Sequence, residues 1–159
     1  MLLDVLEYLA HLGKERYRAI ILHASPDKGS SVTEFARKVC VHTGGTYLDL
    51  LGLFIQDQGL SQRIDTFSPA RLRALLIERS QGTPLLFVDR ADFLLDTWRR
   101  EERRTFFRMV DRQWDGYKDS MRAKLWVALQ TSPEIEALRI VDSQGQCRVL
   151  RLSDFTDIL

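Results

Sequence analysis

The 159-residue sequence predicts an α/β fold of three layers, in which helices cover both faces of a five-stranded parallel sheet. Apolar runs without polar alternation occur at 19–22, at 124–129 and at 85–89, where an acid ends the run. Such runs are typical of parallel strands that are covered on both faces. Helical patterns separate them, as in a sheet built by crossover connections. We expect two further strands, at 46–50 and 146–152.

Length and composition favour one globular domain that spans 1–159 and begins with an amphipathic helix in 1–17. Hydrophobic residues make up 45% of the chain, charged residues 28%, and the net charge is +1. No apolar run approaches the ~20 residues that a membrane span needs, so we expect a cytoplasmic protein without a membrane partner. Cys40 and Cys147 lack metal-binding spacing, which predicts two buried thiols in a reducing compartment.

The first apolar run leads into a loop and a helical pattern, and this stretch matches part of the phosphate-loop motif G-x-x-x-x-G-K-[ST]. Gly29 takes the second glycine, Ser31 supplies the hydroxyl for a metal ion, and Ser30 stands where the lysine belongs. Lys28 comes two places early. A loop that opens a helix presents backbone N–H groups and the positive end of the helix dipole to an anion. The sequence therefore predicts a phosphate site at Lys28, Gly29, Ser30 and Ser31.

An acid, Asp89, ends the apolar run at 85–89. Open α/β sheets bind ligands at the carboxyl ends of their strands, and carboxylate and hydroxyl oxygens suit Mg²⁺. We therefore predict that Asp89 and Ser31 hold a magnesium ion. The alternative is an aspartate that caps the helix that follows.

The order of the elements resembles that of AAA-like additional-strand phosphate-loop ATPases, and among them the small BrxF family of bacteriophage exclusion (BREX) systems. The residues that carry the resemblance are the loop after the first strand, the strand Pro84–Asp89 and the following Asp92–Leu95. The resemblance implies a sheet order of 5-1-4-3-2, no lid domain, ATP and Mg²⁺ as ligands, and a larger bacterial assembly with an antiviral role. It also implies that Thr131 senses the γ-phosphate. The alternative for Thr131 is a helix start with Ser132 as N-cap.

Members of that ATPase class usually place a glutamate directly after the strand-ending aspartate, where it polarises the attacking water. This chain has Arg90 there, and Asp92 is the nearest other acid. General base catalysis contributes roughly 10²–10⁴ in rate, so we expect a weak ATPase or none. An inactive scaffold with the same fold is the competing hypothesis.

A long helix is predicted over 91–114, with an apolar side toward the sheet and a basic side. The basic side comprises Arg99, Arg100, Arg103, Arg104 and Arg108. Three interpretations stay open: a solvated face of ion pairs, a contact to nucleic-acid phosphates, or a surface that docks an acidic protein. The sequence thus predicts a nucleotide-binding subunit of a larger protein complex. The alternative is a scaffold or a DNA-contacting adaptor. Whether the chain associates with itself is left open.

Overall fold

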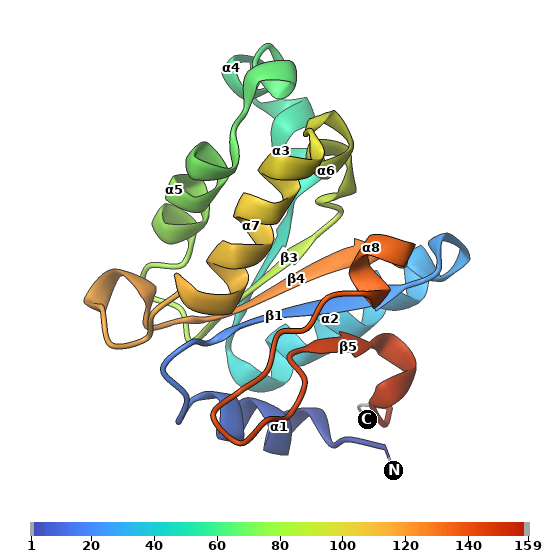
Figure 1. The fold of residues 1–159 in the computed structure, drawn as a ribbon, viewed down its shortest axis with the longest axis vertical. Coiled ribbons are helices and arrows are strands. Elements are labelled where there is room, and N and C mark those ends of the chain that lie inside the picture. The colour runs from blue at the N-terminus through green and yellow to red at the C-terminus, as the bar shows by residue number, and fades with distance from the viewer. Residues whose placement is uncertain (1, 158–159) are drawn as a thin grey trace.

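The computed structural model describes residues 2–157, and at its centre is a five-stranded sheet in which all strands run parallel (Figure 1). The strands are β1 (Ala19–Ala24), β2 (Thr46–Asp49), β3 (Leu85–Asp89), β4 (Lys124–Gln130) and β5 (Val149–Arg151). Their order across the sheet is β2-β3-β4-β1-β5, which is the expected order 5-1-4-3-2 counted from the other edge. The α/β class, the parallel sheet and the strand order are therefore confirmed.

Helices cover both faces of the sheet (Figure 1). They are α1 (Val5–Leu12), α2 (Gly29–Thr43), α3 (Leu50–Gln56), α4 (Gln58–Ser61), α5 (Pro69–Arg79), α6 (Asp92–Thr97), α7 (Arg100–Arg112) and α8 (Pro133–Glu136). One face packs Ile20 and Trp126 against α1 and α2, while the other packs Ile21 and Val127 against α3, α5, α6 and α7. This division follows from the strand geometry, because successive side chains point to opposite faces.

The N-terminal helix is shorter than expected, because Asp4 caps its start and Gly13 caps its end. The Asp4 carboxylate accepts hydrogen bonds from the backbone N–H groups of Leu6 and Glu7, as an N-cap does. Its buried stripe is Val5, Tyr8, Leu9 and Leu12, at helical spacing. Leu2 and Leu6 also fall at helical spacing in the sequence, which predicts that they share this stripe, but both side chains are exposed.

The long helix expected over 91–114 is two helices, α6 and α7, with an extended link at Trp98 and Arg99. The indole of Trp98 is buried and donates to the backbone carbonyl of Phe67 at 2.7 Å. A guanidinium N–H of Arg103 donates to the Trp98 carbonyl at 2.6 Å, so the break is hydrogen-bonded on both sides. The apolar residues expected to face the sheet are buried, as predicted: Leu95, Trp98, Phe106, Met109 and Val110.

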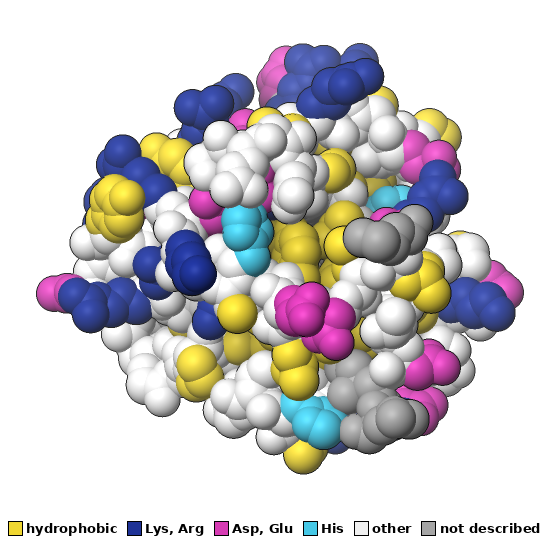
Figure 2. All heavy atoms as spheres, turned by 90° about the horizontal axis from the view of Figure 1, so that it is seen from below, with side chains coloured by type: hydrophobic (Ala, Val, Ile, Leu, Met, Phe, Trp, Pro, Cys, Tyr) yellow, Lys and Arg dark blue, Asp and Glu magenta, His cyan; other side chains and the backbone are white. Residues whose placement is uncertain are grey.

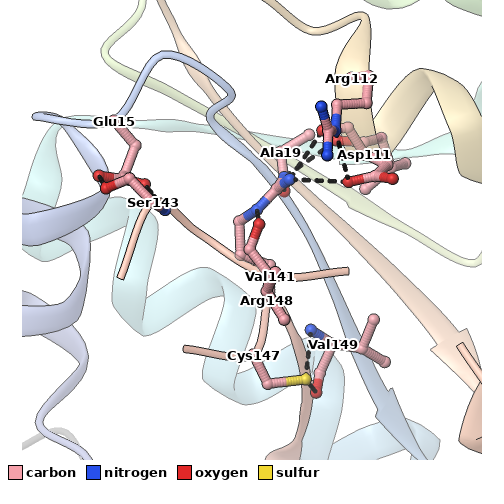
Figure 3. Close-up of polar contacts among 10 residues, drawn as sticks. Glu15, Ala19, Asp111, Arg112, Val141, Ser143, Cys147, Arg148 and Val149 are labelled. Carbon is pink, nitrogen blue, oxygen red and sulfur yellow. Dashed lines mark hydrogen bonds and ion pairs between the residues drawn. The ribbon is translucent and has the colours of Figure 1, made fainter. Parts of the chain in front are cut away.

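Arg148, the residue just before β5, is buried and joins three segments of the chain (Figure 3). Its side chain is 2% exposed and donates to four backbone carbonyls. Those carbonyls belong to Ala19 (2.7 Å), Val110 (3.1 Å), Asp111 (2.7 Å) and Val141 (3.1 Å). Burial lowers the pKa of Arg148 below its ordinary value. Strand β1, α7 and the segment before β5 are thereby fixed to one another.

The segment between α8 and β5 folds back on itself and is held by Glu15, which lies shortly after α1. Val141 and Cys147 form an antiparallel bridge, and the Glu15 carboxylate accepts from the N–H and the hydroxyl of Ser143, each at 2.6 Å. Cys147 is exposed in this turn, so the prediction of two buried thiols holds only for Cys40, whose pKa burial raises to about 11.

The two ends of the described chain lie side by side. Leu3 and Phe155 form a parallel bridge, with the Leu3 N–H donating to the Asp154 carbonyl at 2.8 Å. Figure 2 shows this underside of the molecule, where hydrophobic side chains reach the surface between polar ones and most Lys and Arg side chains lie toward the rim. Within residues 2–157, no helix is long and apolar enough to cross a bilayer.

Candidate functional site

The predicted phosphate loop is a single tight turn between β1 and α2. Residues Pro26–Lys28 form one turn of 3-10 helix, and the Lys28 N–H donates to the Ser25 carbonyl at 2.9 Å. Helix α2 then begins at Gly29, and no side chain caps its first turn. The first N–H groups of a helix have no intrahelical partner, so the start of α2 can accept an anion at the carboxyl edge of the sheet.

Asp89, at the end of β3, is the centre of a buried hydrogen-bond network. The residue is 4% exposed, and its Oδ2 atom accepts from the hydroxyls of Thr33 and Tyr47, each at 2.6 Å. Its Oδ1 atom accepts from the N–H of Arg90 at 2.9 Å. Burial and the bond to Asp89 raise the pKa of Tyr47 to about 12, so the phenol remains a donor. These bonds tie α2, β2 and β3 together at one point.

The hydroxyl that faces Asp89 is that of Thr33, and the structure does not bring Ser31 to this carboxylate. Two residues along a helix correspond to a rotation of about 200°, so Ser31 and Thr33 point to nearly opposite sides of α2. The structure therefore places Thr33 beside Asp89, in the position where the sequence led us to expect Ser31. Both serine and aspartate nonetheless lie at the same edge of the sheet, at the start of α2 and the end of β3.

The predicted site residues are divided between two cavities on either side of the start of α2. The first cavity has a volume of about 520 Å³ and lies toward β3 and β4. It is lined by Gly29, Ser30 and Asp89, together with Thr33 and Arg37 from α2 and Tyr47 from β2. The sequence did not single out Thr33, Arg37 or Tyr47. In the strand register Tyr47 lies opposite Phe87, two positions before Asp89, and its hydroxyl reaches Asp89 diagonally across β2 and β3.

The second cavity, of about 500 Å³, lies toward β5 and holds the other predicted residues, Lys28, Ser31 and Thr131. His23 also lines it, is 3% exposed, and is hydrogen-bonded through Nδ1 to the Thr131 hydroxyl at 2.8 Å. Burial, and then the charge of Arg151, lower the pKa of His23, which favours the neutral ring. Thr131 is thus bound to β1 through His23. Ser132 caps α8, as the alternative for this stretch predicted.

Arg90, in the position where the resemblance to ATPases leads us to expect a glutamate, has a left-handed backbone with φ of 56°. An L-residue with a Cβ is strained in this region. Its guanidinium donates to Asp49 Oδ1 at 2.8 Å and to Asp49 Oδ2 through a second N–H. This pairing lowers the pKa of Asp49. Arg90 therefore orders the rim of the first cavity and supplies no base for hydrolysis.

Asp92 lines both the first cavity and a neighbouring groove between α7 and α8. Its Oδ1 atom accepts from the N–H of Gln130 at the end of β4, at 2.8 Å. Burial raises the pKa of Asp92 above its ordinary value. The Asp92 carboxylate, in the first turn of α6, is consequently fixed to the end of β4.

The arginine side of α7 is largely free of ion pairs. Arg100, Arg104 and Arg108 are exposed and make no side-chain hydrogen bond or ion pair with any residue from 2 to 157. Arg103 differs, because it pairs with Glu134 at 2.7 Å and also bonds the Trp98 carbonyl. A groove of about 830 Å³ between α7 and α8 is lined by Arg100, Arg103 and Arg104. The ion-paired face that one interpretation expected is therefore absent at Arg100, Arg104 and Arg108 among the described residues.

Thr33 and Asp89 fit a magnesium ion that arrives with phosphate ligands. No group of three or more His, Cys, Asp or Glu side chains able to hold a metal occurs in the part of the chain that the structure describes. Mg²⁺ usually keeps several waters and takes only one or two protein ligands beside phosphates. A hydroxyl and a carboxylate at 2.6 Å from each other match that requirement, and the ion would neutralise phosphate charge there.

Comparison of the chain with protein-family models, with curated proteins and with solved structures finds no match.

Proposed function

We propose that this chain binds a nucleoside phosphate together with Mg²⁺ in the first cavity, as a weakly hydrolysing or non-hydrolysing subunit of a larger assembly. The contact of Thr33 with Asp89 carries the proposal. It places a hydroxyl from the first turns of a helix against a strand-ending carboxylate, beside the open start of that helix. Such a site suits an anion accompanied by a hard cation.

Weak or absent hydrolysis follows from the same geometry. Arg90 replaces the expected glutamate and is committed to Asp49, while Asp92 is bound to the Gln130 N–H. No carboxylate in the first cavity is therefore free of a hydrogen bond among the described residues. We accordingly infer a binding switch whose assembly supplies any missing catalytic group. The resemblance to BrxF subunits is the basis for placing that assembly in antiviral defence.

Thermal unfolding with Mg·ADP and Mg·ATP tests the proposal. A ligand present at 100 times its Kd should raise the unfolding free energy by about 2.7 kcal/mol. Thr33→Val and Asp89→Asn should abolish the increase. Ser31→Ala is the matched control, because Ser31 lines the other cavity and its variant should respond as the unaltered chain does. No shift for the unaltered chain at millimolar nucleotide would exclude binding by this chain alone.

A docking or nucleic-acid role for the arginine side of α7 is the second candidate, and the absence of ion pairs at three exposed arginines favours it. Unpaired guanidinium groups at i, i+4 and i+8 form a stripe that fits a row of phosphates or an acidic surface. Fluorescence anisotropy with duplex DNA at two salt concentrations tests whether nucleic acid binds this stripe. DNA binding should weaken steeply with salt and be lost when Arg100, Arg104 and Arg108 are all changed to Glu. An unchanged anisotropy at low salt would exclude nucleic acid as the partner of this surface.

A further inference from the structure

The first cavity lacks the lysine that phosphate loops normally provide, because Ser30 lines it in that position. Lys28, the displaced lysine, lines the second cavity instead. Two cationic side chains line the first cavity, Arg37 and Arg90. Arg90 donates to both carboxylate oxygens of Asp49, so its charge is already neutralised. Arg37 is the remaining cation.

Arg37 is placed on α2 one turn after Thr33, so both side chains share a face of the helix. Its guanidinium lies over the ring of Tyr47, with 4.4 Å between Cζ and the ring centroid. Arg37 makes no ion pair or hydrogen bond with a residue in the described range 2–157. The ring is itself fixed, since the Tyr47 hydroxyl donates to Asp89. A cation–π contact holds the guanidinium in place and leaves its N–H groups available to a ligand.

We propose that Arg37 is the phosphate-binding cation of this chain, seated on Tyr47 and acting in place of the absent motif lysine. The inference rests on the proposed function and adds the group that recognises the ligand. A guanidinium offers two parallel N–H donors, which match two oxygens of one phosphoryl group. The ligand is therefore a nucleoside phosphate with a terminal phosphoryl group that reaches the Tyr47 side of the cavity.

The charges around Arg37 also set the form of the ligand. Asp49, Asp89 and Asp92 line the same cavity, so one unpaired arginine faces three carboxylates, one of them paired with Arg90. A phosphate without a counterion would meet net repulsion there. The magnesium complex is thus the species that binds, and free nucleotide in the presence of a chelator should bind much more weakly.

Isothermal titration with Mg·ADP and Mg·ATP tests the role of Arg37. Arg37→Ala should raise Kd by about 10- to 100-fold, the range for loss of a charge-assisted hydrogen bond, and Arg37→Lys should fall between this variant and the unaltered chain. Lys28→Ala should change Kd by less than about twofold. Lys38→Ala is a matched control on the same helix, because Lys38 pairs with Glu34 and does not line the cavity. Unliganded melting temperatures of all variants exclude unfolding as the cause of a loss.

The outcomes separate this inference from the proposed function. Loss of affinity in Arg37→Ala with retention in Lys28→Ala supports both. Equal affinity of Arg37→Ala and the unaltered chain overturns the role of Arg37 and leaves the nucleotide site standing, as does a loss confined to Lys28→Ala. If the unaltered chain shows no heat of binding with either magnesium complex, the proposed function fails and the inference fails with it.

Discussion

Replacing Arg148 with methionine should destabilise the protein strongly, because the change removes a donor from four backbone carbonyls while keeping most of the side-chain volume. At about 1 kcal/mol net for each of the four hydrogen bonds, the loss is about 4 kcal/mol. The contact to the Asp111 carboxylate at 3.3 Å adds little, since that side chain is 32% exposed. Methionine is uncharged, so the variant avoids the free-energy cost of burying the guanidinium charge, and the expected loss of stability falls to about 3 kcal/mol.

Urea unfolding followed by tryptophan fluorescence measures this loss. Because domains of this size are stable by about 5–15 kcal/mol, a loss of about 3 kcal/mol shifts the midpoint visibly. Arg151→Met is the control: its guanidinium pairs with Glu136 at 3.0 Å, but both side chains are about half exposed, so the cost should stay below about 1 kcal/mol. An Arg148→Met variant as stable as the Arg151→Met variant would refute the argument that the carbonyls depend on this donor.

Three further predictions follow from single contacts. Asp92→Asn should raise the melting temperature at pH 7 and have little effect near pH 3. A carboxyl whose folded pKa is raised stabilises the fold below its unfolded pKa, and this contribution is lost as the pH rises through the folded pKa. Melting curves at both pH values check this. Tyr47→Phe removes a donor from Asp89 and should cost about 1–2 kcal/mol in urea unfolding, whereas Tyr117→Phe, on an exposed ring, should cost nothing measurable. Gly44→Ala should cost about 1 kcal/mol in the same assay, since Gly44 ends α2 with φ of 71°; an unchanged midpoint would contradict this account of the turn.

The fold was predictable from the sequence because its signals are local and repeated. Buried parallel strands produce unbroken apolar runs, and the run at 85–89 is buried throughout, with β3 at the bounds expected. Ser68 and Pro69 begin α5 as N-cap and first residue, and Gly44 ends α2 in the left-handed conformation. Each of these features depends on a few adjacent residues.

The break at Trp98 was not predictable in the same way. The segment 91–114 contains no proline or glycine, so its pattern favours one continuous helix. The helix stops because the indole of Trp98 bonds the carbonyl of Phe67, a residue 31 positions earlier. Arg148 presents the same difficulty, because an arginine in a region of alternating polarity is expected at the surface, and its four carbonyl partners are known only from the tertiary structure.

The candidate site was predictable in place but not in its residues. Asp89 and the start of α2 lie at the same edge of the sheet, as a strand-loop-helix pattern with a later strand-ending acid predicts. The rotation of α2 decided which hydroxyl faces Asp89. The 3-10 turn at Pro26–Lys28 sets that rotation, and the motif alignment, which assumes an open loop, assigned Ser31 where the structure has Thr33.

The position of β1 within the sheet has a consequence for how the chain is made. Both neighbours of β1 come from the last third of the sequence, since Ile21 pairs with Val127 on one side and Val149 on the other. During synthesis, β1 therefore emerges from the ribosome long before either partner exists, with two open edges and an apolar sequence. A nascent chain stalled after β3 should be prone to aggregation and should be a client for holding chaperones until β4 is complete.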